Sequence, residues 1–257
     1  MACKILSMVL IVSFAIAPAA HGMGDTPLHR AAREGDMTTL RRLLPEPTFW
    51  QRLLGRRRVD VDRLLSSRDK RGRTPLHEAA FNNRCDAARL LLGCGADANV
   101  KMGNDMTPLL VAIAGGDGNV EVVRLLIAHG ADVDARWTVI PHSKYVETAL
   151  FTAVSAGHGR VVRVLLEAGA SVDAESSGTT PLWAVFLSTG GPTALRMMRL
   201  LLCHGADVNR SEYRDRTLLC RAVSTGNNAR QVRLLLEYGA EFLPSSNHCA
   251  RGARGCW

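Results

Sequence analysis

The chain has 257 residues, of which 47% are apolar and 22% are charged, so it can bury a sizeable core and is not a disordered chain. Leu and Ala dominate and aromatic residues make up only 5%, a composition that favours helices. The net charge is +8, and residues 41–73 hold most of the excess, with eleven basic side chains against four acidic ones. This charge suits an acidic partner, but it does not select between protein, nucleic acid and membrane.

The first residues have the three-part layout of a secretory signal peptide. A basic start at residues 1–4 precedes an uncharged stretch over residues 5–20, which ends in Ala-Pro-Ala-Ala. The stretch has sixteen residues, whereas a membrane-spanning helix needs ~20. We therefore expect residues 1–22 to be a signal peptide and the protein to be secreted or endomembrane. The alternative is a start at Met23 and a cytoplasmic or nuclear protein.

A tetrapeptide that begins with Thr recurs along the rest of the chain. It reads Thr-Pro-Leu-His in its first two copies, and its six Thr residues are Thr26, Thr74, Thr107, Thr148, Thr180 and Thr217. A Thr side chain accepts a hydrogen bond from a free amide of a first helical turn, and a Pro after it sacrifices no hydrogen bond there. Each copy therefore predicts the start of a short helix.

Signals for the end of that helix, and for a second helix, follow each copy. Nine residues after the Thr, five copies have a residue suited to the left-handed conformation that ends a helix: Gly35, Asn83, Gly116, Gly157 and Gly226. An aliphatic run then leads to a Gly-Ala pair in every copy but the first, at Gly95, Gly130, Gly169, Gly205 and Gly239. The pattern predicts two helices per repeat and a polar turn before the next Thr.

These Thr-Pro-Leu-His and Gly-Ala-Asp-Val-Asn signatures, recurring in register, resemble the ankyrin repeat family over roughly residues 25–242. The resemblance implies an all-α fold, an ankyrin-repeat solenoid of six stacked helix-turn-helix units with projecting loops. Ala149 and Leu218 replace the Pro in two copies, which weakens those helix starts. Residues 45–65 interrupt the first repeat as a basic insertion, and residues 243–257 are a polar C-terminal tail.

Catalytic and metal-binding patterns are missing from the sequence. It has no Cys-x-x-Cys, His-Glu-x-x-His, Gly-x-Ser-x-Gly or Walker motif. By resemblance, His29 and His77 tie a helix start to its neighbouring loop, while the rings of His129 and His204 can meet free carbonyls at helix ends. We therefore predict no enzymatic activity, no catalytic residue, no metal and no cofactor.

Six cysteines follow the leader. Four lie in helical patterns and are expected to be buried free thiols: Cys85, Cys94, Cys203 and Cys220. Cys249 and Cys256 lie in the polar tail, where they could pair in an oxidising compartment. Asn209-Arg210-Ser211 is an acceptor sequence for N-glycosylation, so we expect a glycan at Asn209 if the chain is secreted.

Binding is the activity that remains, and residues outside the repeat pattern are free for it. The loop between the third and fourth repeats is longer than its counterparts and carries Trp137 and Tyr145, which we predict to be partner-binding residues. In the alternative reading, Trp137 folds back onto a neighbouring repeat. Tyr213 and Arg214, on the equivalent loop before the sixth repeat, are predicted to bind as well.

Two further surfaces are predicted to bind. The resemblance implies a concave face formed by exposed positions of the first helices, four and seven residues after the Thr: Arg30, Arg33, Glu78 and Phe81. In the insertion, apolar residues at helical spacing (Phe49, Trp50, Leu53, Leu54) precede Arg56, Arg57 and Arg58. A basic amphipathic helix of this kind can meet an anionic membrane surface, an acidic groove or calmodulin. The alternative is a helix that packs on the first two repeats with its arginines in water.

The sequence as a whole predicts a non-catalytic protein–protein interaction module. We expect a monomer that has no transmembrane span, does not bind nucleic acid directly, and takes a protein partner, acidic if residues 41–73 contact it. The alternative is an intracellular ankyrin-repeat regulator, such as a transcriptional co-regulator. That alternative applies if the leader is not a functional signal.

Overall fold

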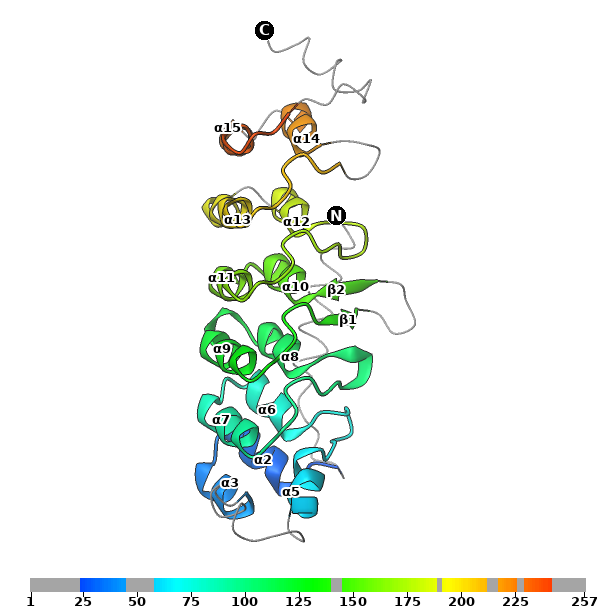
Figure 1. Cartoon of the computed structure of the whole chain (residues 1–257), viewed down its shortest axis with the longest axis vertical. Helices are drawn as coiled ribbons and strands as arrows, with labels where there is room; N and C mark the ends of the chain where they lie inside the picture. Colours follow the sequence, from blue (N-terminus) through cyan, green and yellow to red (C-terminus); the bar gives the residue numbers. More distant parts are fainter. Residues whose placement is uncertain are drawn as a thin grey trace.

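The computed structural model describes residues 24–44, 58–139, 145–188, 191–211, 217–225 and 229–241. Its repeats stack into an elongated molecule with two columns of helices (Figure 1). The first-helix column consists of α2 (Pro27–Glu34), α6 (Pro75–Phe81), α8 (Pro108–Ala114), α10 (Ala149–Ala156), α12 (Pro181–Leu187) and α14 (Leu218–Thr225). The second-helix column consists of α3 (Met37–Leu43), α7 (Cys85–Gly93), α9 (Val120–Ala128), α11 (Gly159–Glu167), α13 (Pro192–Cys203) and α15 (Ala229–Glu237). The predicted solenoid of helix pairs is confirmed.

The Thr residues begin the first helices as predicted. In five repeats the Thr Oγ1 accepts a hydrogen bond from the amide three residues further on, at 3.2–3.4 Å. In the second repeat, the Thr74 amide donates to Nδ1 of His77 at 3.1 Å, and the Thr74 hydroxyl lies 2.9 Å from the same nitrogen. The helices that begin at Ala149 and Leu218 keep the Thr cap, which explains why they form without Pro.

Left-handed residues follow most of the helices where Gly or Asn was expected, but Gly116, with φ 122° and ψ 173°, does not adopt this conformation, because its helix ends at Gly115 in a right-handed conformation. Gly226 lies outside the described residues. Gly35 has φ 78° and Asn83 has φ 55°, and the glycines of the Gly-Ala pairs have φ between 80° and 96°. A Cβ is costly in this conformation, which explains the regular spacing of glycine. At two of these helix ends, Nδ1 of His129 and Nδ1 of His204 bond a carbonyl one turn back, at 2.8 and 2.9 Å, as expected.

Two buried histidines connect the first three repeats. Nε2 of His29 lies 2.9 Å from the carbonyl oxygen of Arg73, in the loop before α6. Nε2 of His77 lies 3.2 Å from the carbonyl oxygen of Met106, in the loop before α8. Each ring thus spans from one helix start to the loop of the following repeat, which confirms the structural role implied by the family resemblance.

One hydrophobic core runs along the whole stack, from Leu28 to Ala240. From α2 to α12, each first helix packs on the first helices of the adjacent repeats, as α6 does between α2 and α8, and each second helix packs on its neighbours in the second-helix column. Leu91 of α7 and Leu165 of α11 are fully buried in this core. This core is a continuous row of contacts between neighbouring repeats, so stability arises from repeat stacking and not from a single compact centre.

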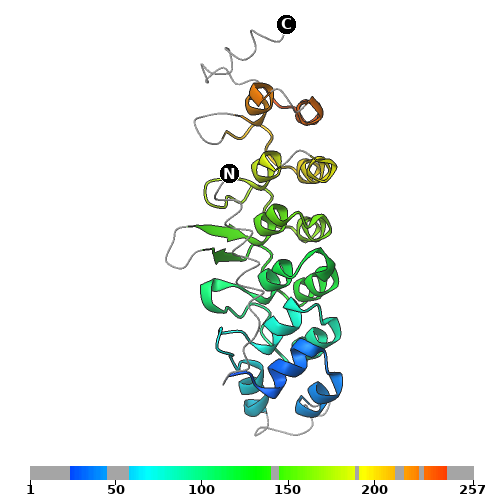
Figure 2. The same cartoon turned by 180° about the vertical axis from the view of Figure 1, so that it is seen from behind.

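The long loop between the third and fourth repeats forms a short hairpin. Strand β1 (Arg136–Thr138) pairs antiparallel with β2 (Val146–Thr148), and Trp137 is the register partner of Glu147. The hairpin projects on the side of the first-helix column, as both views show (Figures 1 and 2). It adds a small β element to an otherwise helical architecture that includes the single turns η1 (Gly103–Asp105) and η2 (Asp117–Asn119).

The described end of the basic insertion forms helix α5 (Arg58–Leu65). Val61 and Leu65 are buried in the core, while Arg63 is exposed. This part of the insertion therefore contributes to the core, while the predicted helix that carries Phe49, Trp50, Leu53 and Leu54 lies outside the described residues and both readings of it stay predictions. Residues 45–57, the leader 1–22 and the tail 243–257 lie outside the described residues.

Candidate protein-binding surface

The first-helix column presents the positions four and seven residues after each Thr to the side of the hairpin. We define the first-helix face as the exposed and half-buried side chains at these positions, which are Arg30, Arg33, Phe81, Ala114, Ser155, Leu187, Arg221 and Ser224. Leu187 is 44% exposed at the end of α12, although an apolar side chain of this size usually packs in a core. We did not select Leu187 from the sequence, although its position seven residues after Thr180 could have identified it.

A charged cluster joins the first two repeats on this face. Arg33 Nε lies 2.9 Å from Glu78 Oε2, and Arg33 Nη2 lies 2.8 Å from Asp25 Oδ2. The second carboxylate oxygen of Glu78 lies 3.2 Å from Arg73 Nη1. Glu78 is only 3% exposed, and both of its oxygens are occupied by arginines. The expectation that Glu78 is exposed for a partner is therefore wrong, because its carboxylate neutralises a buried guanidinium.

Phe81 extends the same cluster. The guanidinium carbon of Arg73 lies 5.5 Å from the centre of the Phe81 ring, and Arg73 is 6% exposed. A cation held over an aromatic face is attracted by the ring quadrupole. Phe81 is half-buried and covers this contact, so one side of its ring stabilises the repeat stack. Arg73 belongs to the basic stretch 41–73, but its charge is directed inward.

Trp137 is a core residue of the hairpin. It is 4% exposed, and its Nε1 donates to Thr152 Oγ1 at 3.0 Å. The Thr152 hydroxyl in turn can donate to the Thr148 carbonyl oxygen at 3.0 Å or to Glu147 Oε2 at 3.3 Å, and both acceptors belong to β2, so the contact holds β2 on α10. The prediction of an exposed anchor at Trp137 is therefore wrong, and the alternative, packing on a neighbouring repeat, is confirmed. Tyr145, by contrast, is 51% exposed.

Several predicted site residues cannot be assigned a side-chain environment. Arg56, Arg57, Tyr213 and Arg214 lie outside the described residues, and Arg58 begins α5 without a described side chain. Their predicted binding roles stay predictions.

Asn209 has a structural role on the turn that leaves the fifth repeat. Its side-chain amide donates to the Gly239 carbonyl at 3.1 Å and accepts from the Glu241 amide at 2.8 Å. Asn99 makes the same two bonds between the second and third repeats. Asn209 is therefore half-buried in a repeat-to-repeat bond, and its glycosylation stays a prediction.

The cysteines differ in part from the expectation. Among the cysteines that the structure describes, Cys85 and Cys94 are half-buried and form no disulfide, and Cys203 forms no disulfide but is exposed. Cys220 is buried as expected, but it is disulfide-bonded rather than free. The predicted pairing of Cys249 with Cys256 lies outside the described residues.

The buried ring of His77 is held neutral. Burial lowers the pKa of His77 to about 4, and the nearby positive charges of Arg73 and Arg68 act in the same direction. Because Nδ1 accepts the Thr74 amide proton, the ring proton resides on Nε2 and is donated to Met106. The neutral His77 ring therefore serves the contact between the second repeat and the loop before α8. Within the described residues, His, Cys, Asp and Glu side chains form no group suited to a metal ion, and no helix is long and apolar enough to span a membrane.

The stacked helix pairs and projecting loops define a solenoid repeat protein, an architecture typical of protein–protein interaction modules. The family model for ankyrin repeats (three copies) matches residues 3–102, 51–137, 90–176 and 138–212. These matches cover far more than half of the chain, so the chain belongs to the ankyrin repeat family.

Relatives and solved structures agree with this assignment. The chain is 32% identical over 220 residues to the mouse B-cell lymphoma 3 protein homolog, covering 85% of this chain and 45% of the relative. It is 33% identical over 192 residues to the rat transient receptor potential cation channel subfamily V member 5, covering 70% of this chain and 24% of the channel. The chain thus spans less than half the length of these curated relatives.

Among solved structures, the chain is similar to the ankyrin repeat domain of Bcl-3, described as a unique member of the IkappaB protein family. The TM-score is 0.67 at 30% identity, with coverage of 86% of this chain and 89% of that domain. An ankyrin repeat domain from Acinetobacter baumannii also has a TM-score of 0.67, at 31% identity, with coverage of 84% and 98%. The repeat architecture is therefore shared with domains from distant organisms.

Proposed function

We propose that this protein binds a partner protein through the first-helix face together with the β1–β2 hairpin, the concave side that the family resemblance implies. The observation that carries the proposal is the exposure of Leu187 and Tyr145, at 44% and 51%. Leu187 ends a first helix and Tyr145 enters the projecting hairpin. Tyr and Arg are enriched among the residues that anchor interfaces, and an exposed Leu on the same surface adds apolar area that a partner can cover.

The repeat pattern supports the same choice of face. Stacking uses the fully buried leucines between repeats, so it does not require apolar side chains in water at positions 145 and 187. Arg30 and Arg221 are exposed in the same helix column and supply polar contacts around the apolar anchors. A partner that covers this face would remove apolar surface from water, which favours binding by about 25 cal/mol for each Å² buried.

Two cellular compartments are considered for this binding. If residues 1–22 act as a signal peptide, the module binds its partner in a secreted or endomembrane setting. The similarity to the B-cell lymphoma 3 protein homolog supports the second candidate, an intracellular regulator such as a transcriptional co-regulator. Binding through the first-helix face applies in either setting.

Partner capture from extracts of the native cell tests the binding face. We expect Leu187→Ser and Tyr145→Ser, each alone, to lower recovery of the same partner at least tenfold. The matched control is Leu236→Ser, because Leu236 is 52% exposed but belongs to the second helix of the last repeat. Equal recovery with all three variants, or loss with Leu236→Ser alone, would contradict the proposal.

A further inference from the structure

The second-helix column carries paired arginines over its last three repeats. Helices α11, α13 and α15 each have Arg at two positions that are three residues apart, so both side chains lie on one side of the helix. We call this set the outer arginine face: Arg160, Arg163, Arg196, Arg199, Arg230 and Arg233. All six side chains are exposed.

The charge pattern changes sign along the second-helix column. In α7 and α9 the first of the two positions is acidic, Asp86 and Glu121. In the three following second helices the same position is Arg. Three acidic neighbours of the outer arginine face are already engaged. Glu167 pairs with Arg124 at 3.5 Å, Glu237 pairs with Arg199 at 3.9 Å, and Asp117 accepts from the backbone amides of Arg160 and Val161 at 3.0 and 3.3 Å. Within the described part of the chain, the other arginines of the face form no ion pair.

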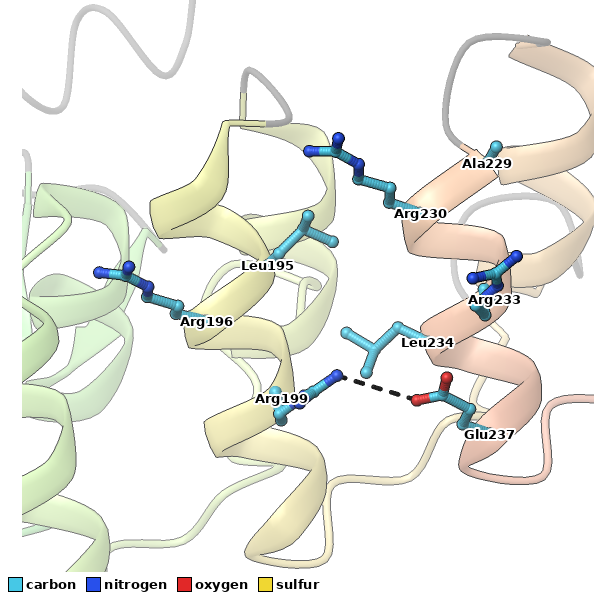
Figure 3. A pocket seen from close by; sticks show the side chains of 8 residues that line it. All are labelled: Leu195, Arg196, Arg199, Ala229, Arg230, Arg233, Leu234 and Glu237. Carbon is cyan, nitrogen blue, oxygen red and sulfur yellow. Dashed lines mark ion pairs between the residues drawn. The ribbon is translucent and has the colours of Figure 1, made fainter.

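A groove with an apolar floor crosses this face between α13 and α15. It has a volume of about 580 Å³, and four of the six arginines line it. Leu195 and Leu234 point into it from the two helices, and Arg230 reaches over one end (Figure 3). The ion pair between Arg199 and Glu237 closes the other end. The groove therefore offers an apolar pocket lined by three arginines without an ion pair among the described residues, Arg196, Arg230 and Arg233, and by the Arg199–Glu237 pair.

We propose that the outer arginine face binds an acidic segment of a partner protein, with an apolar side chain of that segment seated between Leu195 and Leu234. Carboxylates fit because guanidinium groups bind them bidentately. The spacing also fits, since packed helices lie 8–10 Å apart, and three residues of a polyproline II segment span ~9 Å and bring the side chain back to the same side of the peptide. Acidic residues at every third position would thus meet successive helices. This surface is separate from the first-helix face.

Charge and shape favour this occupant over the alternatives. The chain's own tail carries Arg251 and Arg254, which the face would repel. Single-stranded nucleic acid binds through aromatic stacking platforms, and no residue that lines the groove is aromatic. An anionic membrane needs apolar side chains that protrude, whereas Leu234 is buried in the groove floor.

Fluorescence anisotropy with the full chain and a defined probe tests the proposal. The probe is a labelled 12-residue peptide of four Glu-Leu-Glu units, titrated at several salt concentrations. We expect the double variant Arg196→Gln/Arg230→Gln to raise the Kd at least tenfold and to flatten its salt dependence. A Glu-Gly-Glu peptide of the same charge should bind several-fold more weakly, because it lacks the apolar side chain.

The matched control is Arg41→Gln/Arg89→Gln, two exposed arginines on α3 and α7 whose loss changes the net charge equally. It should change the Kd less than twofold. An equal effect of both double variants would overturn the proposal, because attraction would then follow net charge alone. So would failure of the wild-type chain to bind the probe, or tighter binding of a 20-nucleotide DNA strand or of phosphatidylserine vesicles with the same dependence on Arg196 and Arg230.

Discussion

Glu78 illustrates how one carboxylate stabilises two repeats. Its oxygens contact Arg73 and Arg33, and Arg73 is nearly as buried as Glu78 itself. Removing one partner of a buried pair leaves the other charge uncompensated in a poorly solvated site. The cluster therefore stabilises the repeat stack, although two of its members, Arg33 and Glu78, occupy positions that the sequence predicted to bind a partner.

We expect Glu78→Ala to lower the free energy of unfolding by ~3–5 kcal/mol, because Arg73 keeps its charge without a partner. Urea unfolding followed by circular dichroism measures this difference. The matched control is Glu167→Ala, which breaks an exposed pair with Arg124 and should cost less than ~1 kcal/mol. Equal losses for the two variants would show that the burial of Glu78 does not contribute.

His77 gives the stack a pH dependence with a defined sign. Its pKa is about 4 in the folded protein and about 6.5 in an unfolded chain. Between these values the unfolded chain binds more protons, so the stabilising contribution is complete above pH 6.5 and is lost as the pH falls towards 4. At about 1.4 kcal/mol per pKa unit, the loss reaches roughly 3 kcal/mol.

A His77→Gln variant tests this assignment. Its stability deficit relative to the wild type should shrink as the pH is lowered from 7 to 4, because the wild type alone loses the His77 contribution. Urea unfolding at half-unit pH steps measures the deficit. A constant deficit across this range would mean that His77 does not titrate differently in the folded and unfolded chains.

At the scale of the helix and the turn, most of the fold could be predicted from local sequence signals. The Thr caps and left-handed glycines act within a few residues, so their spacing is readable without tertiary information. The burial of Trp137 was not readable in this way, because it depends on a hydrogen bond to Thr152 across the hairpin. Glu78 was misassigned for a similar reason. Its partner Arg73 precedes the helix, and the sequence does not show that the Arg73 side chain folds back onto Glu78.

The outer arginine face was missed for a different physical reason. Its arginines recur roughly one repeat apart and are interspersed with acidic residues, so charge averaged along the sequence outside residues 41–73 is nearly neutral. Only the stacking of α11, α13 and α15 brings the arginines together. Conversely, Arg73 in the most basic stretch points inward, and Arg68 donates to the carbonyl oxygens of Gly72 and Lys101. The density of basic residues along the sequence therefore overstated the basic surface of residues 41–73 and concealed the outer arginine face.

The second helices should be stabilised through their buried leucines. We expect Leu91→Ala and Leu165→Ala each to cost ~2–5 kcal/mol, because each leaves a cavity between repeats. The exposed Arg30→Ala should cost less than ~0.5 kcal/mol. Thermal and urea unfolding of the three variants provide the comparison, and similar losses at buried and exposed sites would be incompatible with stacking as the source of stability.

At the scale of the whole molecule, the compartment decides which partners are available. If the leader directs secretion, protein expressed from Met1 in its own cell type should start near residues 20–23 and carry a glycan at Asn209. Ser211→Ala is the informative variant, because it removes the acceptor sequence and keeps the bonds of Asn209 to the next repeat. It should abolish the mass shift without loss of stability. An intact Met1, or a start at Met23 in the cytosol, would favour the intracellular regulator.

The basic insertion is a separate whole-molecule question. If Arg56, Arg57 and Arg58 contact an acidic partner, changing all three to Gln should weaken capture of that partner and flatten its salt dependence. Affinity measured over a salt series provides the readout. Unchanged affinity would leave this segment as a solvated part of the first repeat.

Site-specific photo-crosslinking tests the central claim, that a partner protein covers the first-helix face, most directly. A benzophenone amino acid is placed in turn at Leu187, at Tyr145 and at Glu121, an exposed residue of the second-helix column. Irradiation in the native cell should give the same partner adduct from positions 187 and 145, and none from position 121. An adduct from position 121 alone would place the partner on the opposite column and contradict the account.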